Sequence, residues 1–211
     1  MAVISFPPVS HADEDGLLAV GGDLEVGSLV RAYRSGIFPW PLSEEQLLWF
    51  APPQRAVLFF DEFHVPRRLL RSVKHRGFST QQDTAFRKVI TKCAEVANRG
   101  EQQGTWITEE MIEAYCALHA AGHAHSFETY QGSELVGGIY GVRIGRLFAA
   151  ESSFYRVSDA SKVAMCFLVD SLRAEGLEWM DCQVLTPFSS SFGAREIPRD
   201  RYMELLAGAL L

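Results

Sequence analysis

Apolar and polar positions along the 211-residue chain follow two periods, which predict a mixture of helices and strands. Helical signals lie at residues 26–35, 65–77, 83–100 and 158–176, and in stretches that begin near 108 and 198. Strand signals lie at residues 47–51, 56–60, 78–82, 124–130, 134–143, 146–152, 176–187 and 195–197. From residue 78 the predicted order is β-α-α-β-β-β-α-β-α-β. Asp83 and Ser158 are the predicted N-caps of their helices.

The first sixty residues are rich in proline, glycine and aromatic residues, which leaves room only for short strands. We therefore expect a small N-terminal domain at residues 1–62 and a larger domain at residues 63–211. The element order of the larger domain is shared by the GCN5-related N-acetyltransferase fold, a mixed α/β sheet with flanking helices. That fold class is our expectation, although a fold alone does not determine function.

The predicted strand at 176–187 carries an acid and an amide among apolar residues. Asp181 and Gln183 are two residues apart, so a regular strand turns both to one face and Cys182 to the other, packed face. Burying a carboxylate costs several kcal/mol unless the group is paired or used. Glu151 is a similar case, because it ends a largely apolar strand. We expect Asp181 and Gln183 to point into an opening of the sheet.

Composition is that of an ordinary globular protein, with 47% apolar and 22% charged residues. No apolar run approaches the roughly 18 residues that span a bilayer, and the first residues do not resemble a signal peptide. The four cysteines have no CxxC spacing, which argues against a disulfide framework or a zinc site. We expect a cytoplasmic protein that does not contact a membrane.

Charge is unevenly distributed along the chain, although the net charge is −6. Residues 67–99 contain nine bases and two acids, which gives a local charge of +7. A run of this kind is either a solvated face or a surface that binds phosphate groups. The composition leaves both interpretations open.

Two further features could indicate ligand sites. His119, His123 and His125 lie close together, but Gly122 interrupts the helix and no acid or cysteine lies at ligand spacing, so hydrogen bonding is favoured over a metal. The glycine-rich segments "VGGDL" and "VGGIYGVRIG" match no nucleotide-binding pattern. The loop at 156–161 contains no glycine, which weakens the case for coenzyme A as a ligand of an acetyltransferase-like fold.

Ten short motifs occur in order between Gly16 and Arg199, and together they resemble the leucyl/phenylalanyl-tRNA–protein transferase family. The motifs are "GLLAVGGDL", "AYRSGIFPW", "LLWFAPPQRAVL", "GTWIT", "EAYCALHAAGHAHSFE", "LVGGIYGV", "LFAAESSFYR", "ASK", "DCQV" and "FGAREIPR". Each motif alone is weak, whereas the series is highly specific.

The resemblance implies a bacterial cytosolic enzyme that takes leucine or phenylalanine from charged tRNA. It links that amino acid to the N-terminal amine of a protein that begins with Arg or Lys, which marks the protein for degradation. It also implies a small N-terminal domain on an acetyltransferase-like domain, with aminoacyl-tRNA in place of acetyl coenzyme A. We expect a monomer without a metal or a cofactor.

The resemblance also implies roles for the polar residues of the sheet. Asp181 and Gln183 would draw a proton from the attacking amine and orient it, and Glu151 would hold the cationic N-terminal residue. In an alternative that stays open, the ribose hydroxyl of the tRNA assists and Asp181 mainly positions groups. Two rival functions are an acetyl-CoA-dependent N-acetyltransferase and a catalytically silent RNA-binding module.

Binding residues follow from the same resemblance. The apolar pocket for the donor side chain matches Ile139, Phe148 and Leu168, and the aromatics around the terminal adenosine match Trp49 and Trp106. The bases expected to meet tRNA phosphates are Arg76, Lys88, Lys92, Arg156 and Lys162. Three positions depart from the family pattern. Ser153 replaces a larger apolar residue in the substrate-binding pocket, Asp159 replaces a common Asn, and Phe188 replaces a common His.

Overall fold

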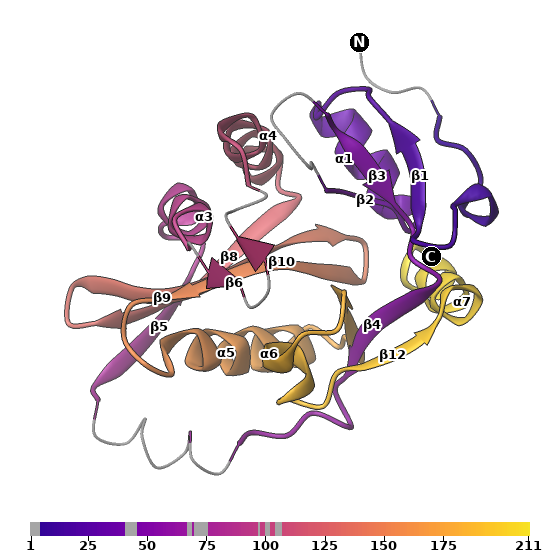
Figure 1. The fold of residues 1–211 in the computed structure, drawn as a ribbon. Coiled ribbons are helices and arrows are strands. Elements are labelled where there is room, and N and C mark those ends of the chain that lie inside the picture. Colours follow the sequence, from indigo (N-terminus) through magenta and orange to yellow (C-terminus); the bar gives the residue numbers. More distant parts are fainter. Residues whose placement is uncertain are drawn as a thin grey trace.

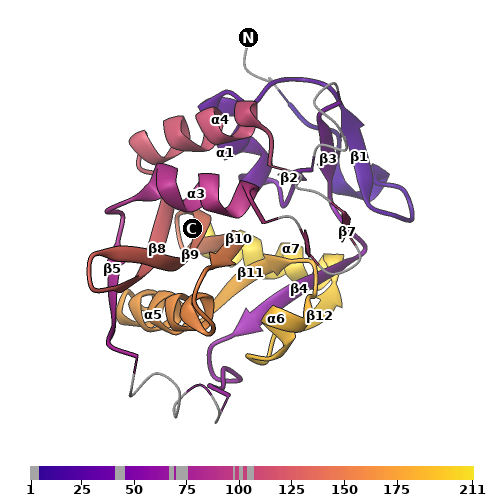
Figure 2. The same cartoon turned by 60° about the vertical axis from the view of Figure 1, so that its left-hand side comes forward.

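The computed structural model describes residues 5–40, 46–66, 69, 76–96, 98–99, 102–103 and 107–211. These residues form a small sheet of three strands and a larger sheet of seven strands, with helices packed around both (Figure 1, Figure 2). A separate two-stranded pair joins β6 (Asn98–Arg99) to β7 (Gln102–Gln103). Among the described residues, no helix is long and apolar enough to cross a membrane.

The small sheet belongs to the N-terminal part of the chain. It contains β1 (Leu17–Val20), β2 (Phe38–Pro39) and β3 (Leu48–Phe50) in the order β1-β3-β2, after a short helix η1 (Val9–His11). Helix α1 (Val26–Arg34) packs beside this sheet and buries Leu29, Ala32 and Tyr33. These three side chains join the core that also contains residues of α3, α4 and β9. The N-terminal part is therefore attached to the rest of the molecule through a shared apolar core.

The large sheet has the strand order β12-β4-β11-β10-β9-β8-β5. Its strands are β4 (Gln54–Phe59), β5 (Phe78–Gln82), β8 (Ala124–Gln131), β9 (Glu134–Ile144), β10 (Leu147–Tyr155), β11 (Trp179–Gln183) and β12 (Arg195–Pro198). Neighbouring strands are antiparallel except for β10 and β11, which are parallel. The parallel pair marks the middle of the sheet.

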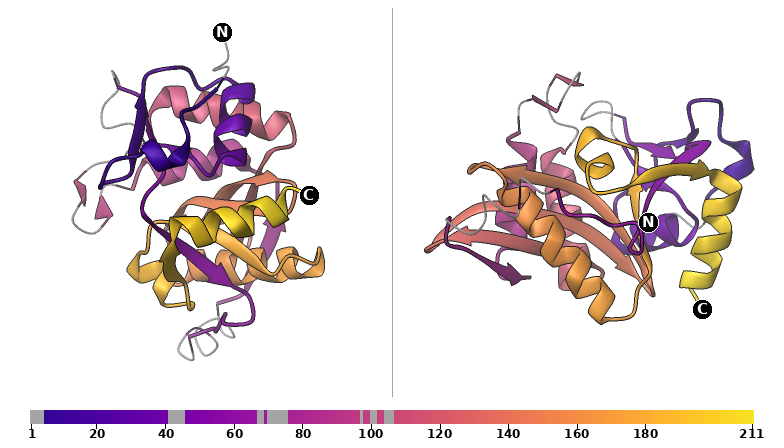
Figure 3. Two further views of the ribbon diagram at one scale, coloured as in Figure 1. Left: turned by 90° about the vertical axis from the view of Figure 1, so that its right-hand side faces the viewer. Right: turned by 90° about the horizontal axis from the view of Figure 1, so that it is seen from below.

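Helices cover both faces of the large sheet. Helices α3 (Phe86–Ala94) and α4 (Glu109–Ala120) lie on one face, and α5 (Ala160–Ala174) crosses the opposite face, as the right-hand view of Figure 3 shows in orange. The short α6 (Pro187–Ser190) follows β11, and α7 (Arg199–Ala209) packs against β4 and β12. Separate apolar clusters fill the space under α3 and α4, under α5 and under α7.

A glycine in β9 sets the position of α5. A Cβ atom added to Gly137 would lie 2.6 Å from the Cβ atom of Ala160 and 2.7 Å from its backbone carbon. Any side chain at residue 137 would therefore push the first turn of α5 away from the sheet. Thr129 in β8 adds a hydrogen bond to the Ala160 carbonyl, 2.9 Å long. Together these contacts fix the start of α5 over the sheet.

The predicted helices and strands are confirmed where the structure describes them, with shifted ends, except that residues 98–99 of the predicted helix 83–100 lie in strand β6. The predicted basic helix at 65–77 lies mostly outside the described residues. Both predicted caps are wrong: Ala85 and Asp159 are the N-cap residues, and Asp83 instead accepts hydrogen bonds from His125 and from the Ser126 backbone. The predicted domain boundary after residue 62 assigns β4 to the N-terminal domain. In the structure, β4 instead pairs with β11 and β12 inside the large sheet.

Candidate active site

A cavity of about 850 Å³ lies beside the end of β11 and receives side chains from both parts of the molecule. Trp40 contributes from the N-terminal part, and the other lining residues come from the end of α3, from β9, β10, α5, β11 and α6. Its apolar wall includes Ile139, Phe154, Met165, Cys182 and Phe188, and its charged residues are Lys92, Glu95, Glu151 and Arg156. The cavity thus combines an apolar surface with groups of both charges.

Two irregularities in neighbouring strands shape the wall of the cavity. Strands β10 and β11 pair at Ala149 and Asp181. Just beyond this point, the register of β10 with β9 shifts at Glu151, and the register of β11 with β4 shifts at Cys182. Bulges of this kind bend a strand and redirect its side chains. Gln183 follows with a φ of +59°, a left-handed conformation that is uncommon for a residue other than glycine.

Glu151 is the less exposed of the two acids that line this cavity. Its Oε1 accepts hydrogen bonds from the Tyr33 hydroxyl and from the Gln183 side-chain amide, both 2.7 Å long. Its Oε2 lies 3.4 Å from the Tyr115 hydroxyl. Burial raises the pKa of Glu151 to about 7, although the Tyr33 hydrogen bond opposes this effect. The carboxyl group therefore changes its charge near neutral pH.

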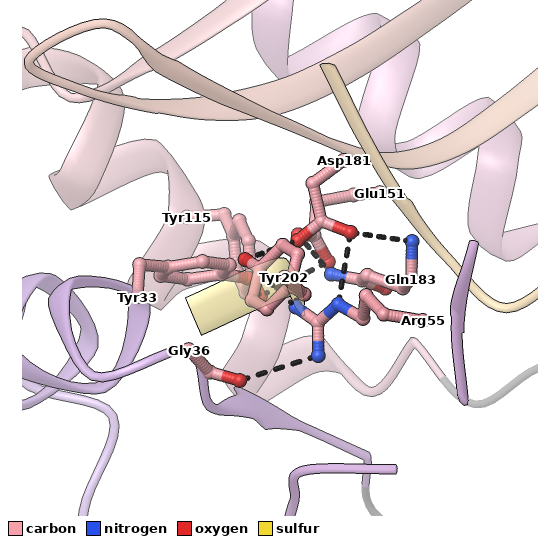
Figure 4. A network of polar contacts seen from close by, with 8 residues as sticks. All are labelled: Tyr33, Gly36, Arg55, Tyr115, Glu151, Asp181, Gln183 and Tyr202. Carbon is pink, nitrogen blue, oxygen red and sulfur yellow. Dashed lines mark hydrogen bonds and ion pairs between the residues drawn. The ribbon is translucent and has the colours of Figure 1, made fainter. Parts of the chain in front are cut away.

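Asp181 lies next to Glu151 but is fully buried (0% exposed) and does not line the cavity. Arg55 binds both of its oxygens, with distances of 2.9 Å from Nε to Oδ1 and 2.6 Å from NH2 to Oδ2. The Tyr202 hydroxyl donates to Oδ2 at 2.9 Å, and the Gln183 backbone N–H donates to Oδ1 at 2.8 Å (Figure 4). Asp181 is thus paired on both oxygens and fixes the bend at Gln183.

Arg55 connects this network to the N-terminal part. Its guanidinium group lies 4.5 Å from the ring centre of Phe38 and 4.6 Å from that of Tyr202, and it also donates to the Gly36 carbonyl. Burial alone would lower the pKa of Arg55, but the charge of Asp181 raises it. The pair is therefore ionised inside the protein, where each charge depends on the other.

Six of the predicted catalytic and binding residues line the cavity together, as does Phe188. They are Lys92, Ile139, Glu151, Ser153, Arg156 and Gln183. Asp181 does not line the cavity, but it accepts a hydrogen bond from the backbone of Gln183, which does. The expectation that Asp181 points into the opening and Cys182 away from it is wrong, because the bulge at Cys182 breaks the alternation and brings that side chain to the cavity.

Three other predicted binding residues are buried and do not line the cavity. Phe148 and Leu168 are 1% and 0% exposed, in the core cluster that also contains Ile139 and Met165. Trp49 is 1% exposed, and its indole N–H donates to the Gly21 carbonyl, which leaves no ring face open to a ligand. Trp106 lies outside the described residues.

The predicted tRNA-binding bases separate into two sets. Lys92 and Arg156 lie at the cavity, where Glu95 is 2.6 Å from the Lys92 ammonium group and 3.9 Å from the Arg156 guanidinium group. The other three, which do not line it, are Arg76, Lys88 and Lys162. Lys88 is exposed, and Lys162 pairs with Asp159 at 3.0 Å. The bases at the cavity and at the start of α5 are thus paired with acids, whereas Lys88 on α3 is exposed.

Sequence reasoning missed most of the polar network. Tyr33, Arg55, Tyr115 and Tyr202 surround the two acids, and none of them was a candidate. Arg55 had a usable signal, because it is the only base in the apolar strand "RAVLFF" and could have indicated a buried partner for an acid. The tyrosines gave no such signal, since their spacing fits ordinary core positions.

The histidines of the segment 119–125 do not form a metal site in the described part of the chain. His119 donates through Nδ1 to the Ala124 carbonyl and stacks on Phe86, while His125 contacts Asp83 at 2.7 Å. No group of three metal-binding side chains occurs among the described residues. These contacts tie the start of β8 to the turn before α3.

The arrangement suits acyl transfer to an amine. A carboxyl group that titrates near neutral pH can handle the proton of an ammonium group, and an adjacent amide can orient the resulting amine. The apolar wall can hold an uncharged side chain, and the bases at the opening can hold phosphates. Each of these features belongs to the same cavity.

Comparisons with known proteins agree with this chemistry. The family model "Leucyl/phenylalanyl-tRNA protein transferase" matches residues 57–207, and the model of that family's N-terminal domain matches residues 22–53. Among solved structures, a crystal structure of FemX has a TM-score of 0.54 at 11% identity, and the alignment covers 85% of this chain and 70% of FemX. The FemX likeness concerns the fold alone.

Curated relatives extend the match over nearly the whole chain. A leucyl/phenylalanyl-tRNA–protein transferase from Anaeromyxobacter sp. (strain K) is 50% identical over 206 residues, which cover 98% of this chain and 88% of the relative. One from Flavobacterium johnsoniae is 46% identical over 201 residues, which cover 95% and 94%. The chain therefore belongs to the leucyl/phenylalanyl-tRNA–protein transferase family, a family of aminoacyltransferases.

Proposed function

We propose that this enzyme transfers leucine or phenylalanine from charged tRNA to the N-terminal amine of proteins that begin with Arg or Lys. The observation that carries the proposal is the cavity itself, in which Glu151 and Gln183 adjoin an apolar wall and the bases Lys92 and Arg156. The modified proteins are thereby marked for degradation. The enzyme acts in the bacterial cytoplasm as a monomer and uses no cofactor.

The donor side chain occupies the apolar wall. Ile139 and Met165 border the cavity, and Phe148 and Leu168 support them from the core cluster behind. A wall of this kind accepts leucine or phenylalanine by burial of apolar surface. Ser153 leaves more room than a larger apolar residue would, so it influences the choice between the two donors.

The terminal adenosine of the tRNA stacks near Trp40, the tryptophan that borders the cavity. Trp49 supports this region from inside the N-terminal core, and Trp106 is assigned to the same region from the family resemblance. Lys92 and Arg156 hold phosphates at the opening. Lys162, Lys88 and Arg76 extend the phosphate-binding surface outward.

The acceptor amine binds between Gln183 and Glu151. Gln183 orients the amine, and Asp181 acts by positioning Gln183, because both oxygens of Asp181 are already occupied. The negative charge of Glu151, with Glu95 at the opening, favours a cationic N-terminal residue over an acidic one. This assignment follows the alternative in which Asp181 is mainly a positioning residue.

The larger domain has the acetyltransferase-like fold, with the donor moved from coenzyme A to tRNA. The element order, the parallel pair β10 and β11 and the likeness to FemX support this fold. The loop before α5 contains no glycine, and Asp159 lies in it as an acid. An acidic residue at this position disfavours the pyrophosphate of coenzyme A.

A transfer assay tests the proposal. The purified enzyme is mixed with tRNA charged with labelled leucine and with peptides that begin with Arg, Lys, Met or Glu. Label is expected on the Arg and Lys peptides, with little on the Met and Glu peptides. Tight binding of coenzyme A without transfer from tRNA would favour an N-acetyltransferase, and tRNA binding without transfer would favour an RNA-binding module.

A further inference from the structure

We propose that Glu151, through its Oε2 atom, is the catalytic group that takes the proton from the acceptor's α-ammonium group, with Tyr33 as its positioning residue. The inference rests on the proposed function, since it concerns the same amine. It goes beyond an electrostatic role for Glu151, because the carboxylate forms a bond to the substrate's proton. It also moves proton transfer away from Asp181.

Asp181 has no oxygen lone pair left for a substrate. A carboxylate can accept about four hydrogen bonds, and Asp181 already accepts from Arg55 Nε, Arg55 NH2, the Tyr202 hydroxyl and the Gln183 backbone. It is also fully buried and separated from the cavity. A proton on Asp181 would break the pair with Arg55 and leave a buried cation unpaired.

Glu151 differs because one of its oxygens, Oε2, has no hydrogen-bond donor at short distance among the described residues. The Tyr33 hydroxyl lies 2.7 Å from Oε1 and 2.7 Å from the Tyr115 hydroxyl. A contact of 2.7 Å between a hydroxyl and a carboxylate must contain the hydroxyl proton, so Tyr33 donates to Oε1. The Tyr115 hydroxyl lies closer to Tyr33, at 2.7 Å, than to Oε2, to which it donates only over a long 3.4 Å contact, so Oε2 keeps lone-pair capacity for a substrate proton.

Gln183 places the amine beside the carboxyl group of Glu151. Its side-chain nitrogen donates to Glu151 Oε1, so its carbonyl oxygen is the atom left to accept an N–H from the substrate. Both residues line the cavity. An ammonium group held by the Gln183 carbonyl therefore has Glu151 as its neighbouring acid.

The surroundings of Glu151 place its titration where the reaction needs it. Burial raises its pKa to about 7, and the negative charge of Asp181 on β11 acts in the same direction. Hydrogen bonds from Tyr33 on α1 and Gln183, and the positive charge of Arg55 on β4, lower it. Tyr115 on α4 faces the same carboxyl group. A base with a pKa near that of an α-amine, roughly 7.7–8.0, exchanges protons with it readily.

The reaction balances with this single base. Glu151 takes one proton from the α-ammonium group, and the amine nitrogen then attacks the carbonyl carbon of the aminoacyl ester. The new C–N bond forms as the C–O bond to the ribose breaks, and the second proton goes from nitrogen to the leaving ribose oxygen. Glu151 afterwards releases its proton to water.

Single-turnover transfer to an Arg-initiated peptide, measured at saturating peptide across pH, tests the role. The wild-type rate is expected to rise with pH around a midpoint of about 7 and then level off. Glu151→Gln is expected to lose this midpoint and to transfer at least about 100-fold more slowly near neutral pH even at saturating peptide, in addition to any rise in the peptide KM that follows from the loss of its negative charge. Its rate should recover as pH rises toward the pKa of the amine.

Two tyrosine variants provide a matched pair, since each removes one buried hydroxyl. Tyr33→Phe removes a donor to Glu151, so its midpoint is expected to move to higher pH. Tyr202→Phe removes a donor to Asp181, so its midpoint is expected to stay at the wild-type value. Thermal melting of each variant checks that it is folded.

Opposite results would overturn the role. A folded Glu151→Gln enzyme with a raised KM and an unchanged maximal rate would leave Glu151 as a holder of positive charge only. An unmoved midpoint in Tyr33→Phe would assign the titration to another group. Absence of any wild-type transfer at every pH would instead reject the proposed function itself.

Discussion

At the scale of single residues, Asp181 and Glu151 are neighbouring acids with opposite surroundings. Asp181 is ionised against Arg55 and accepts hydrogen bonds on both oxygens. Glu151 has no cation bound directly among the described residues, and burial holds its pKa near neutrality. One acid therefore keeps the strand in place, and the other can exchange a proton.

Replacement of Asp181 tests its positioning role. Asp181→Ala leaves Arg55 without its partner and removes the acceptor that fixes Gln183, so transfer is expected to fall by a factor of about ten or more. Asp181→Asn keeps the shape and one acceptor, and should retain more activity. Rates are compared for variants shown to be folded by circular dichroism; a wild-type rate in folded Asp181→Ala would reject the role.

The pH dependence of stability offers a separate test of Glu151. Its pKa in the folded protein is above the usual value, so the folded state binds this proton more tightly than the unfolded state. The resulting stabilisation is complete at low pH and is lost as pH rises through about 7. Glu151→Gln carries no charge at this position. Its free energy of unfolding, relative to that of wild type, should therefore be higher at about pH 8 than at about pH 5.

The measurement is urea unfolding of both proteins at the two pH values. Glu134→Gln is a suitable control, because Glu134 is exposed at the start of β9. A difference between wild type and Glu151→Gln that does not change with pH would show that the carboxyl group does not titrate in this range.

At the scale of elements, the bulges in β10 and β11 create the site. The apolar and polar periods predicted both strands, and they singled out Glu151, Asp181 and Gln183 as polar residues in apolar surroundings. They could not predict the bulges, because a bulge depends on pairing with β9 and β4 rather than on local sequence. Strict alternation therefore assigned Cys182 to the wrong side.

The buried ion pair on β4 is expected to stabilise this part of the sheet. Arg55→Ala leaves Asp181 buried without a cation, and the free energy of unfolding is expected to fall by about 3–5 kcal/mol. Arg195 on the adjacent strand β12 is the matched control, since it also pairs with a carboxylate, Glu62, but both side chains are exposed.

Urea unfolding of the two variants measures the difference. Arg195→Ala should change stability little, because exposed pairs contribute little. Equal losses of unfolding free energy in Arg55→Ala and Arg195→Ala would mean that the buried pair contributes no more to stability than the exposed one.

At the scale of the whole molecule, the site depends on contacts between segments far apart in the sequence. Arg55 and Asp181 are separated by 126 positions, and Tyr33 and Glu151 by 118. The sequence predicted the order of elements, and the series of motifs identified the family. Neither could show that a tyrosine from α1 and an arginine from β4 meet the acids, because the first contact depends on the packing of α1 against the large sheet and the second on the pairing of β4 with β11.

The bases proposed to contact tRNA phosphates lead to a prediction of how the affinity for tRNA depends on salt concentration. Replacing Arg76, Lys88 and Lys92 by Gln should weaken binding and reduce the slope of log affinity against log salt by about one per lost phosphate contact. A triple replacement of Arg146, Arg195 and Arg201, which lie toward β12 and α7, should leave the slope unchanged. Filter binding across salt concentrations measures both; an unchanged slope in the first variant would move the tRNA surface elsewhere.

The central claim is that transfer takes place in the cavity beside Glu151, and obstruction of that cavity tests it most directly. Ser153→Trp places a large side chain in the cavity, whereas Ser79→Trp makes the same change at an exposed position of the edge strand β5. The measurement is transfer of labelled leucine from tRNA to an Arg-initiated peptide by each folded variant. The expected result is a loss of at least about tenfold in Ser153→Trp and a wild-type rate in Ser79→Trp. Wild-type transfer by folded Ser153→Trp would contradict the claim.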